Sequence, residues 1–462
     1  MIANKKIFYP ALLAVMLIGT GARAQRSLLL NFCDYMPASI QTNPSFFPKN
    51  KMFIGLPVLS SIYMKTGTNK FVYSDLIRYN DMAELALDPD NFISRLKPLN
   101  LLSVNFETDL LSGGMRLGNY YISGFITERI DFHFAFPKEM MELAYYGNGH
   151  FLNETVNMDN IGLNVSHFRD YSLGIARKFD KLDVGARFRI LYGMANVTTQ
   201  KSHLSLFTDS TGIYDVTAAT DFQINTSLPD FDDDLDPLDY LANTRNKGYA
   251  FDFGGTYRLN DKFTFALSAV DLGYIYWKDN IKDYISNGSF TFSGFDISNF
   301  VTEDNSDEDP FQSILDSASD AFEVTDTVIN YQTHMAPRLY ASTTYNLSEG
   351  NRVGFLYSAE FYNRRMYPSF TLYFCQENDN ILNSMLSYSV INGDFKNLGA
   401  GSTVRLGPLQ TYLLVDNLIG LLYPQHTRML HVKLGMHLTF GTKKYRGEKS
   451  NRDDEFAPSE GE

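Results

Sequence analysis

The chain has 462 residues, and its 53 acidic and 40 basic side chains give a formal net charge of −13. Hydrophobic residues make up an ordinary 44%, whereas aromatic residues reach 14%, with 36 Phe and 29 Tyr but one Trp. The acidic balance points away from nucleic acid as a partner. Beyond the N-terminus, no segment approaches the 18 uninterrupted apolar residues of a membrane-spanning helix, which excludes a helical membrane protein.

The N-terminus has the pattern of a secretory signal. Lys5 and Lys6 form a basic region, residues 7–18 are apolar, and Ala22-Arg23-Ala24 provides a small-residue cleavage site. The apolar run is about twelve residues, short of the roughly 20 of a membrane span. We therefore expect residues 1–24 to be removed after Ala24, leaving an exported protein that begins with a lead-in, residues 25–51.

Strict alternation of apolar and polar residues then recurs along the chain, for example at 182–194, 248–259, 352–362 and 430–440. This period is that of a β-strand with one apolar face. Eleven residues at about 3.4 Å each, tilted by roughly 40°, cover an apolar band about 25 Å tall. The pattern therefore predicts an all-β fold, a transmembrane antiparallel β-barrel, with a large soluble β-sandwich as the weaker alternative.

Connection lengths alternate between short turns and long joins, as in outer-membrane barrels whose termini both lie in the periplasm. Counting from a first strand at Met52–Tyr63 to a closing strand at Leu430–Phe440 gives fourteen strands. We allow twelve to sixteen, because the pieces 203–207 and 221–224 either extend their neighbours or form another hairpin. The barrel is expected at 52–440, followed by a disordered periplasmic tail at 441–462.

The acidity of the chain is concentrated in two of the long joins, which we expect to be external loops. Residues 199–247 carry nine Asp against three bases, and residues 278–335 carry twelve acids against two bases. The runs 230–239 and 302–310 lack the spacing of an EF-hand, so mobile solvated loops are favoured over Ca²⁺ sites. We also expect a helical turn at 311–322. The two cysteines, Cys33 and Cys375, are compatible either with a disulfide or with two buried thiols.

No motif for catalysis, cofactor binding or metal binding occurs in the chain. His431 and His437 lie on the polar face of the closing strand, but six strand residues separate them by about 20 Å, so they cannot share a metal ion. We predict a protein that is not an enzyme, that needs no cofactor, and in which these histidines line the lumen.

The predicted inward faces of the strands are rich in basic residues. The candidate ligand-binding residues of the lumen are Arg187, Arg189, Arg258, Arg338, Arg352, Arg405 and Lys433. Arg116 also falls on an inward face, and the acidic residues on these faces are Asp183, Asp252 and Glu360. A basic interior would attract an anionic solute or a carboxylate head group. The alternative is that these cations pair with wall and loop carboxylates and fill the lumen.

Three short motifs carry a family resemblance. Asn43-Pro44-Ser45 resembles the Asn-Pro-Ala at the start of FadL-type, PorV-type and PorP-type outer-membrane barrels. The segment from Asp271 to Trp277, DLGYIYW, and Tyr146-Gly147-Asn148 resemble motifs of an uncharacterised Gram-negative outer-membrane barrel family. The resemblance implies a fourteen-stranded FadL-like barrel. Ser45 departs from the usual Ala, and the lead-in looks short for a full plug. We expect Trp277 in the aromatic girdle.

Two functions remain open for a Gram-negative outer-membrane barrel of this kind. The first is binding or passage of a small hydrophobic or amphipathic molecule in a FadL-like manner. The second is a non-enzymatic accessory barrel of a secretion or surface-motility machine, with protein partners at the acidic loops. In both cases the wall contacts outer-membrane lipid, and the terminal aromatic Phe440 is expected to be recognised by the barrel-assembly machinery.

Overall fold

The computed structural model describes residues 28–79, 85–211, 215–229, 237–292, 325–362, 365–377, 381–391 and 393–441. The signal peptide, most of the acidic run 230–239, the run 302–310, the helical turn expected at 311–322 and the tail 442–462 lie outside the described residues. Within the described part, no helix is both long and apolar enough to span a membrane.

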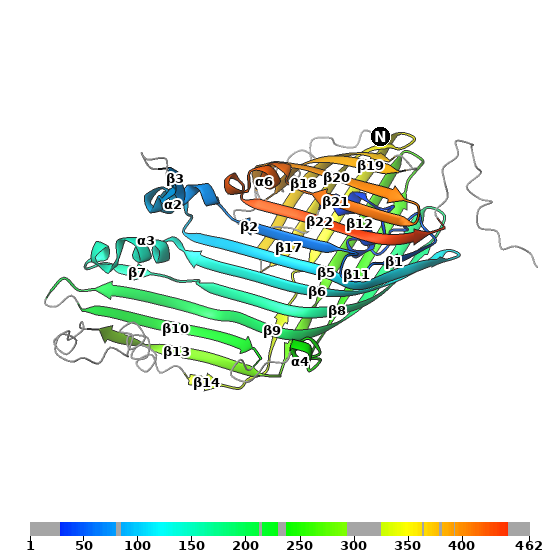
Figure 1. The fold of residues 1–462 in the computed structure, drawn as a ribbon. Coiled ribbons are helices and arrows are strands. Elements are labelled where there is room, and N and C mark those ends of the chain that lie inside the picture. Colours follow the sequence, from blue (N-terminus) through cyan, green and yellow to red (C-terminus); the bar gives the residue numbers. More distant parts are fainter. Residues whose placement is uncertain are drawn as a thin grey trace, which may run out of the picture.

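A closed antiparallel barrel of fourteen strands forms the body of the protein (Figure 1), which confirms the predicted fold class and strand number. The first wall strand is made of two pieces, β1 (Met52–Gly55) and β2 (Ile62–Thr68). The other wall strands are β5 (Leu99–Leu117), β6 (Tyr120–Pro137), β8 (Gly162–Lys178), β9 (Leu182–Thr208), β11 (Asn246–Arg258), β12 (Phe263–Trp277), β16 (Arg338–Ser348), β17 (Asn351–Tyr362), β18 (Arg365–Glu377), β19 (Leu382–Ile391), β20 (Asp394–Leu406), β21 (Leu409–Val415) and β22 (Met429–Phe440).

The last strand closes the barrel on the first. β22 pairs with β21 on one side, and on the other it pairs with β1, where Phe440 lies opposite Met52, and with β2. Along β22, His431, Lys433 and His437 are buried in the interior, while Leu434 and Phe440 are exposed on the outside. The alternation read from the sequence therefore separates a lumen face from a lipid face, as predicted.

The first strand is not continuous, so the prediction of one strand from Met52 to Tyr63 is wrong. Residues 56–61 leave the sheet and interrupt the strand. On the partner strand β22, only Gly435 and Met436 lie opposite this break, because Gly55 pairs with His437 and Ile62 pairs with Leu434. Within the break, Pro57 lacks a backbone N–H for a strand hydrogen bond. Val58 has a positive φ of 65°. The alternation pattern did not reveal this local departure.

The outside of the barrel is apolar. Leu173, Leu267 and Leu372 are each more than half exposed, and many further large apolar side chains of the wall share this outward face. Exposed apolar surface of this extent is unfavourable in water and stable against lipid tails. Because the closed sheet also satisfies its backbone hydrogen bonds internally, the barrel has the architecture of an outer-membrane protein.

At one end the wall continues well beyond the barrel (Figure 1). Residues 196–208 of β9 pair with β10 (Val216–Ser227). β10 pairs along its full length with β13 (Ile281–Phe292), and β14 (Thr325–Thr327) pairs with the other edge of β13. The joins expected to be loops at 199–247 and 278–335 therefore contain long strands. The piece 203–207 extends β9, and 221–224 belongs to β10, which forms a hairpin with β9.

Short elements cap this end of the barrel. We call it the external end, because the short turns and the C-terminal end of β22 lie at the opposite, periplasmic end. The short elements comprise strands β3 (Ile77–Tyr79), β4 (Leu85–Leu87), β7 (Thr155–Asn157) and β15 (Tyr331–His334), helices α2 (Pro89–Arg95), α3 (Lys138–Tyr146), α4 (Pro237–Leu241) and α6 (Leu418–Leu422), and the 3-10 turns η3 (Tyr73–Asp75), η4 (Asn148–Phe151) and η5 (Pro424–His426).

The lead-in folds inside the barrel rather than beneath it. Residues 28–51, with the 3-10 turns η1 (Leu29–Phe32) and η2 (Pro37–Gln41), lie within the lumen, where the dark blue ribbon is seen in Figure 1. Every residue from Leu28 to Phe46 is buried, except Asp34, which is half-buried. The segment is short, as the sequence suggested, yet it forms a plug. We call residues 28–51 the plug.

Candidate functional site

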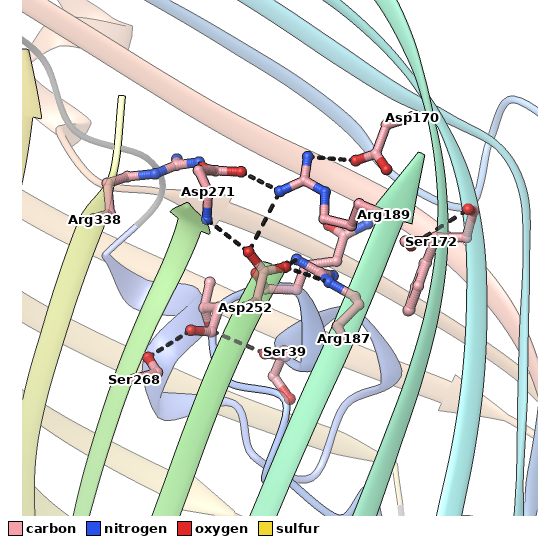
Figure 2. Close-up of polar contacts among 12 residues, drawn as sticks. Ser39, Asp170, Ser172, Arg187, Arg189, Asp252, Ser268, Asp271 and Arg338 are labelled. Atoms are coloured by element: carbon pink, nitrogen blue, oxygen red, sulfur yellow. Dashed lines mark hydrogen bonds and ion pairs between the residues drawn. The ribbon is translucent and has the colours of Figure 1, made fainter. Parts of the chain in front are cut away.

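A cluster of buried charges crosses the lumen above the plug (Figure 2). It combines four arginines with three aspartates, so its formal charge is +4 − 3 = +1, and we call it the lumen network. Its members come from six wall strands and are all buried: Arg129 (β6), Asp170 (β8), Arg187 and Arg189 (β9), Asp252 (β11), Asp271 (β12) and Arg338 (β16). Charges this deeply buried are stable only when they are paired.

Arg189 is the centre of the lumen network and has no exposed surface. Its Nη2 lies 2.5 Å from Asp170 Oδ2, and its Nη1 donates to Asp271 and lies 3.5 Å from Asp252 Oδ1. On the same strand and two residues earlier, Arg187 donates from Nε to Asp252 Oδ2 at 2.6 Å. The i, i+2 spacing of a strand therefore places both guanidinium groups on the lumen face.

Arg129 and Arg338 complete the network from opposite sides. Arg129 donates from Nη1 to Asp271 Oδ1 at 3.1 Å, and its Nη2 lies 3.4 Å from Asp170 Oδ2. Arg338 forms an ion pair with the other oxygen of Asp271. One carboxylate thus serves three guanidinium groups, which makes Asp271 the residue on which the network most depends.

Asp271 reaches this position because the strand is bulged there. Between β11 and β12 the register shifts, since Phe251 pairs with Leu272 whereas Phe253 pairs with Ala269. Asp271 has a left-handed φ of 60°, a conformation that Asp tolerates better than most residues. Its backbone N–H donates to Asp252 Oδ1 at 2.6 Å. The first residue of the DLG motif is therefore the bulge residue that anchors the network.

The plug is tied to the wall by hydrogen bonds just below the network. Arg187 donates from Nη2 to the carbonyl of Gln41 at 3.2 Å, and Ser268 donates from Oγ to the carbonyl of Thr42 at 2.7 Å. Ser45 shares a hydrogen bond of 2.8 Å with the hydroxyl of Thr256 on β11. These bonds connect the plug to the same strands that carry the lumen network.

The Asn43-Pro44-Ser45 motif is the tight turn that makes this docking fit. Asn43 Oδ1 accepts hydrogen bonds from the backbone N–H of Ser45 at 2.9 Å and from its hydroxyl at 2.7 Å, as expected for an Asn-initiated turn. A Cβ atom added at Gly254 would overlap the Asn43 side chain, and one added at Gly185 would overlap the backbone of Pro44. The two wall glycines thus permit the close approach of the plug.

A second buried polar cluster holds the other side of the plug. Gln41 donates from Nε2 to both carboxylate oxygens of Asp109, at 3.0 and 3.1 Å, and Thr127 donates to the same carboxylate at 2.8 Å. Lys433 donates from Nζ to Gln41 Oε1 at 3.3 Å and lies 5.8 Å from the ring centre of Tyr63. The amide of Gln41 therefore bridges an anion and a cation of the wall.

A cavity of about 670 Å³ opens on the external side of the lumen network. We call it the vestibule. Its floor is formed by Arg129, Asp271 and Arg338. Its walls mix polar and apolar side chains. The polar ones include Asn105, Asp131, Asn164, Asn196 and Thr198 from β5, β6, β8 and β9, as well as Gln332, Thr333, His334 and Glu360. The apolar ones are Phe168 of β8, Ile275, Met335, Pro337 and Phe361. The volume is in the range of cavities that bind small molecules in proteins.

The structure separates the candidate residues that the sequence grouped together. Arg187, Arg189 and Arg338 meet in the lumen network, and Arg338 lines the vestibule. Lys433 instead contacts the plug through Gln41. The wall cations therefore do not form one open basic surface, and a ligand-binding role for these residues stays a prediction.

The remaining candidates lie toward the periplasmic end. Arg258 pairs with Asp183 at 2.5 Å. Arg352 pairs with Asp34 of the plug at 2.8 Å and lies 3.5 Å from Glu377. Arg405 lies near the end of β20, opposite Gln410. These positions are remote from the vestibule, and two of the three cations are engaged by carboxylates, as in the alternative weighed from the sequence.

Sequence reasoning missed three members of the network: Arg129, Asp170 and Asp271. Arg129 lies in a strand where Thr127, Arg129 and Asp131 alternate with Ile130 and Phe132, a usable signal. Asp271 could not be assigned by parity, because the bulge reverses the alternation at that point.

Trp277 is not a girdle residue, so that prediction is wrong. The side chain is fully buried, its indole N–H donates to Thr333 Oγ1 at 2.8 Å, and its ring stacks with Tyr331 at a centroid distance of 6.3 Å. A Cβ atom added at Gly193 would overlap the ring. Trp277 packs with Ile275, which lines the vestibule, so the single tryptophan lies beside that cavity.

Both cysteines are free and buried in one apolar cluster. Cys33 of the plug lies with its sulfur 3.6 Å from the sulfur of Met385. Of the two states that the sequence left open, the structure shows two buried thiols, and they contribute packing between the plug and the wall.

Among solved structures, the chain is similar to outer-membrane channels at low sequence identity. The toluene transporter TbuX of Ralstonia pickettii is 11% identical, with a TM-score of 0.43, over 92% of this chain and 97% of that chain. A FadL homologue of Pseudomonas aeruginosa is 8% identical, with a TM-score of 0.41, over 92% of this chain and 100% of that chain. The toluene transporter TodX of Pseudomonas putida is 10% identical, with a TM-score of 0.40, over 91% and 94%.

Sequence comparison gives a family. A search of curated proteins finds no relative. One family model, described as a family of unknown function (DUF5723), matches residues 44–416, which is most of the chain and includes the DLG bulge and the whole lumen network. The chain belongs to this family of unknown function, DUF5723.

Proposed function

We propose that this outer-membrane barrel binds a small amphipathic molecule in the vestibule, as the first step of its passage through the barrel. The observation that carries the proposal is the mixed polar and apolar lining of a cavity of about 670 Å³. A ligand with one apolar and one polar part matches such a lining, because each part replaces water with a surface of its own kind.

The apolar residues of the lining offer contacts to a hydrocarbon body. Phe168, Ile275, Met335 and Phe361 line the cavity from three wall strands and the segment after β15. At about 25 cal/mol per Å² of apolar surface removed from water, burial of about 200 Å² would contribute about 5 kcal/mol. This is enough for weak to moderate binding after the cost of immobilising the ligand.

The floor offers two cations to a head group within a lining of mixed charge. Arg129 and Arg338 lie at the floor with Asp271, and the rest of the lining adds Lys65, Glu107, Asp131 and Glu360, so the formal charge of the whole lining is +3 − 4 = −1. An anionic or zwitterionic head group is therefore expected close to the two arginines, where charges act more strongly than they do in bulk water. Because the two guanidinium groups are already paired with Asp271, they attract a head group through their electrostatic field and do not offer it a free pair of N–H donors.

Passage beyond the vestibule needs movement of the plug. Hydrogen bonds from Arg187 and Ser268 hold the plug directly beneath the network. Asp271 of the floor is linked to Arg187 through Asp252, which accepts hydrogen bonds from the Asp271 backbone N–H and from Arg187. Ligand binding at the floor can therefore act through this link on a residue that holds the plug.

Trp277 provides a direct test of binding. Purified protein in detergent micelles would be titrated with a short brominated carboxylic acid, whose bromine quenches a nearby indole on contact. We expect saturable quenching of Trp277, since this residue packs with the vestibule residue Ile275. Ala336 lines the vestibule between Met335 and Pro337. Ala336→Asp adds a negative charge there and should reduce the affinity for the acid at least tenfold.

Ala242→Asp is the matched control, because it adds the same charge at an exposed position outside the barrel wall. It should leave quenching unchanged. Non-saturable quenching that is equal in the parent protein and in both variants would show that the acid reports only on the micelle, and the proposal would be rejected.

An accessory barrel is the second candidate, and two observations favour it. The plug occupies the lumen, and the β9–β10–β13 extension projects well beyond the barrel (Figure 1). A partner could be recognised there without any transport. Affinity purification from native outer membranes decides between the two: a stoichiometric partner retained by Ala336→Asp and lost on shortening the β9–β10 hairpin supports the accessory function.

A further inference from the structure

The outward face of three neighbouring wall strands changes from apolar to charged at one level. On β8, Leu173 and Ile175 are more than half exposed on the lipid face, and Arg169 lies on the same face toward the external end. Arg169 pairs in the sheet with Tyr192 of β9, and Tyr192 pairs with Lys247 of β11. We call Arg169, Tyr192 and Lys247 the boundary row.

The level of the boundary row matches the external edge of a membrane. Arg177 lies on the same face of β8 at the periplasmic end, where its guanidinium group lies over the rings of Tyr120 and Phe179. From Arg169 to Arg177 there are 177 − 169 = 8 residue steps. At about 3.4 Å per step and a tilt of roughly 40°, these span about 21 Å of an apolar band that is about 25 Å tall in transmembrane barrels. The boundary row therefore lies where the head groups of the external leaflet begin.

The cations of the boundary row are positioned by side chains outside the lumen. Glu128 of β6 accepts from Arg169 Nε at 2.6 Å, and its other oxygen lies 2.8 Å from His167 Nε2. The second ring nitrogen of His167 shares a hydrogen bond of 2.6 Å with the hydroxyl of Tyr240 on α4. Because a guanidinium group has five N–H donors, Arg169 keeps donors for a second anion. Lys247 adds a second cation and is exposed.

The charged groups around the boundary row leave a small positive excess. Arg245 and Asp279 form a pair at 3.1 Å, so their charges largely cancel. Counted over the described charged residues of this region, the formal balance is +4 − 3 = +1, from Arg169, Arg245, Lys247 and Lys278 against Glu128, Asp239 and Asp279. An anionic head group at this level is therefore attracted to the wall.

An apolar groove of about 460 Å³ lies on the lipid face next to the boundary row. The groove exists because Gly113 of β5 and Gly124 of β6 lie opposite each other in the sheet and present no side chain to fill it. Its lining includes Tyr171 and Ile190, each two residues from a member of the boundary row on its own strand, toward the periplasmic end. The groove therefore continues from the cations into the membrane.

We propose that the boundary row and the groove together bind one acyl lipid of the external leaflet that carries phosphate in its head group. Arg binds phosphate through several N–H donors and Lys binds it as a point charge. β8 and β11 are two strand spacings apart, about 10 Å, so the long side chains of Arg169 and Lys247 can reach one phosphate group above Tyr192. An acyl chain of the same molecule then lies in the groove.

The combination of the two features identifies the ligand class. Free phosphate has no part that uses the groove, and an uncharged lipid has no part that uses the cations. The site lies on the lipid face of the wall, opposite the lumen, so this inference is independent of ligand binding in the vestibule.

The test is native mass spectrometry of the full-length protein released from detergent micelles, which counts the lipid molecules that stay bound. One sample contains lipid A, a phosphorylated acyl glycolipid, a second contains the same lipid after removal of its phosphates, and a third contains inorganic phosphate alone. We expect one bound lipid A, with an affinity at least tenfold higher than that of the dephosphorylated lipid. Inorganic phosphate at the same concentration should not bind.

Three variants separate the head-group site from the groove. Arg169→Gln and Lys247→Gln should each lower the affinity for lipid A at least fivefold. Gly124→Leu should lower the affinity for both lipids, because the added side chain fills the groove, while a Cβ at this position meets only an ordinary contact of 3.6 Å with the carbonyl oxygen of Ser172.

Arg177→Gln is the matched control, because it removes an exposed cation from the same face of β8 at the periplasmic end. It should bind lipid A as the parent protein does, and heat-modifiable gel migration shows that every variant is folded. The proposal is overturned if the two lipids bind equally well, if inorganic phosphate binds as tightly as lipid A, or if Lys247→Gln binds lipid A as tightly as the parent protein.

Discussion

Substitution of Asp271 by Asn isolates the energetic role of the lumen network. Asn has nearly the same shape and also tolerates the left-handed φ of 60° found at this position, so the bulge is preserved. The change removes the carboxylate charge shared by Arg129, Arg189 and Arg338 and raises the formal charge of the network from +1 to +2. Breaking a buried ion pair costs about 3–5 kcal/mol.

We expect a loss of about 3 kcal/mol in the free energy of unfolding, at the lower limit because the Asn side-chain oxygen can still accept one hydrogen bond. This corresponds to a change of more than a hundredfold in the equilibrium constant. The assay is urea unfolding of the barrel in lipid vesicles, followed by the fluorescence of Trp277, the single tryptophan. That residue is fully buried and should report the loss of lumen packing.

Asp183→Asn is the matched control for this experiment. Asp183 also pairs with an arginine of the wall, at 2.5 Å, but its partner Arg258 is 29% exposed at the periplasmic end. Asp183 itself is buried, but the partly exposed Arg258 can be solvated once the charge is removed, so the control should lose less than Asp271→Asn, about 1–2 kcal/mol. Equal losses in the two variants, both below about 1 kcal/mol, would refute the view that Asp271 is the main anchor of the network.

Three further predictions follow from contacts of the plug, the tryptophan and the last strand. Gly193→Ala should destabilise the barrel by about 1–3 kcal/mol and shift the emission of Trp277 to longer wavelength, because the added methyl overlaps the indole; unchanged emission would contradict the packing. Asn43→Ala removes two hydrogen bonds of the plug turn, so maleimide should label Cys33 faster in the native protein, whereas thiols of the parent protein should react only after unfolding. Phe440→Ser should lower the folded fraction in outer membranes without affecting refolding in vitro, if assembly machinery recognises that aromatic; equal folded fractions would argue against such recognition.

The wall of the barrel could be predicted because its physics is periodic. Each wall strand has one face toward lipid and one toward the lumen, so residues such as His431 and Leu434 are sorted by parity alone. The pairing of β22 with β1 and β2 could also be predicted from the sequence, because an outer-membrane barrel leaves no strand edge unpaired. Strand number could be counted for the same reason.

The interior could not be predicted in the same way. A bulge at Asp271 and a break at residues 56–61 interrupt the alternation, and parity then gives the wrong face or an unbroken strand. The plug has no strand period, so only its Asn43-Pro44 turn was recognisable. Its docking depends on glycines of distant strands, such as Gly185 and Gly254, whose role appears only when plug and wall are brought together.

Charge gave partial information about the candidate site. The sequence identified Arg187, Arg189 and Arg338 as inward residues, and they do meet in the lumen network. It could not show that each is paired, because Asp170 and Asp271 come from other strands and join them through three-dimensional closure. The vestibule is likewise a product of closure, since its lining residues come from strands as far apart in sequence as β5 and β17.

The most direct test of the central claim, that the vestibule binds an amphipathic molecule above a plugged lumen, is an experimental structure of the protein purified in the presence of a long-chain carboxylic acid. We expect ordered density in the vestibule, with the head group next to Arg129 and Arg338 and the chain against Phe168 and Phe361, while residues 28–51 remain in the lumen. A vestibule that contains only water, with the acid bound elsewhere on the barrel, would contradict the account.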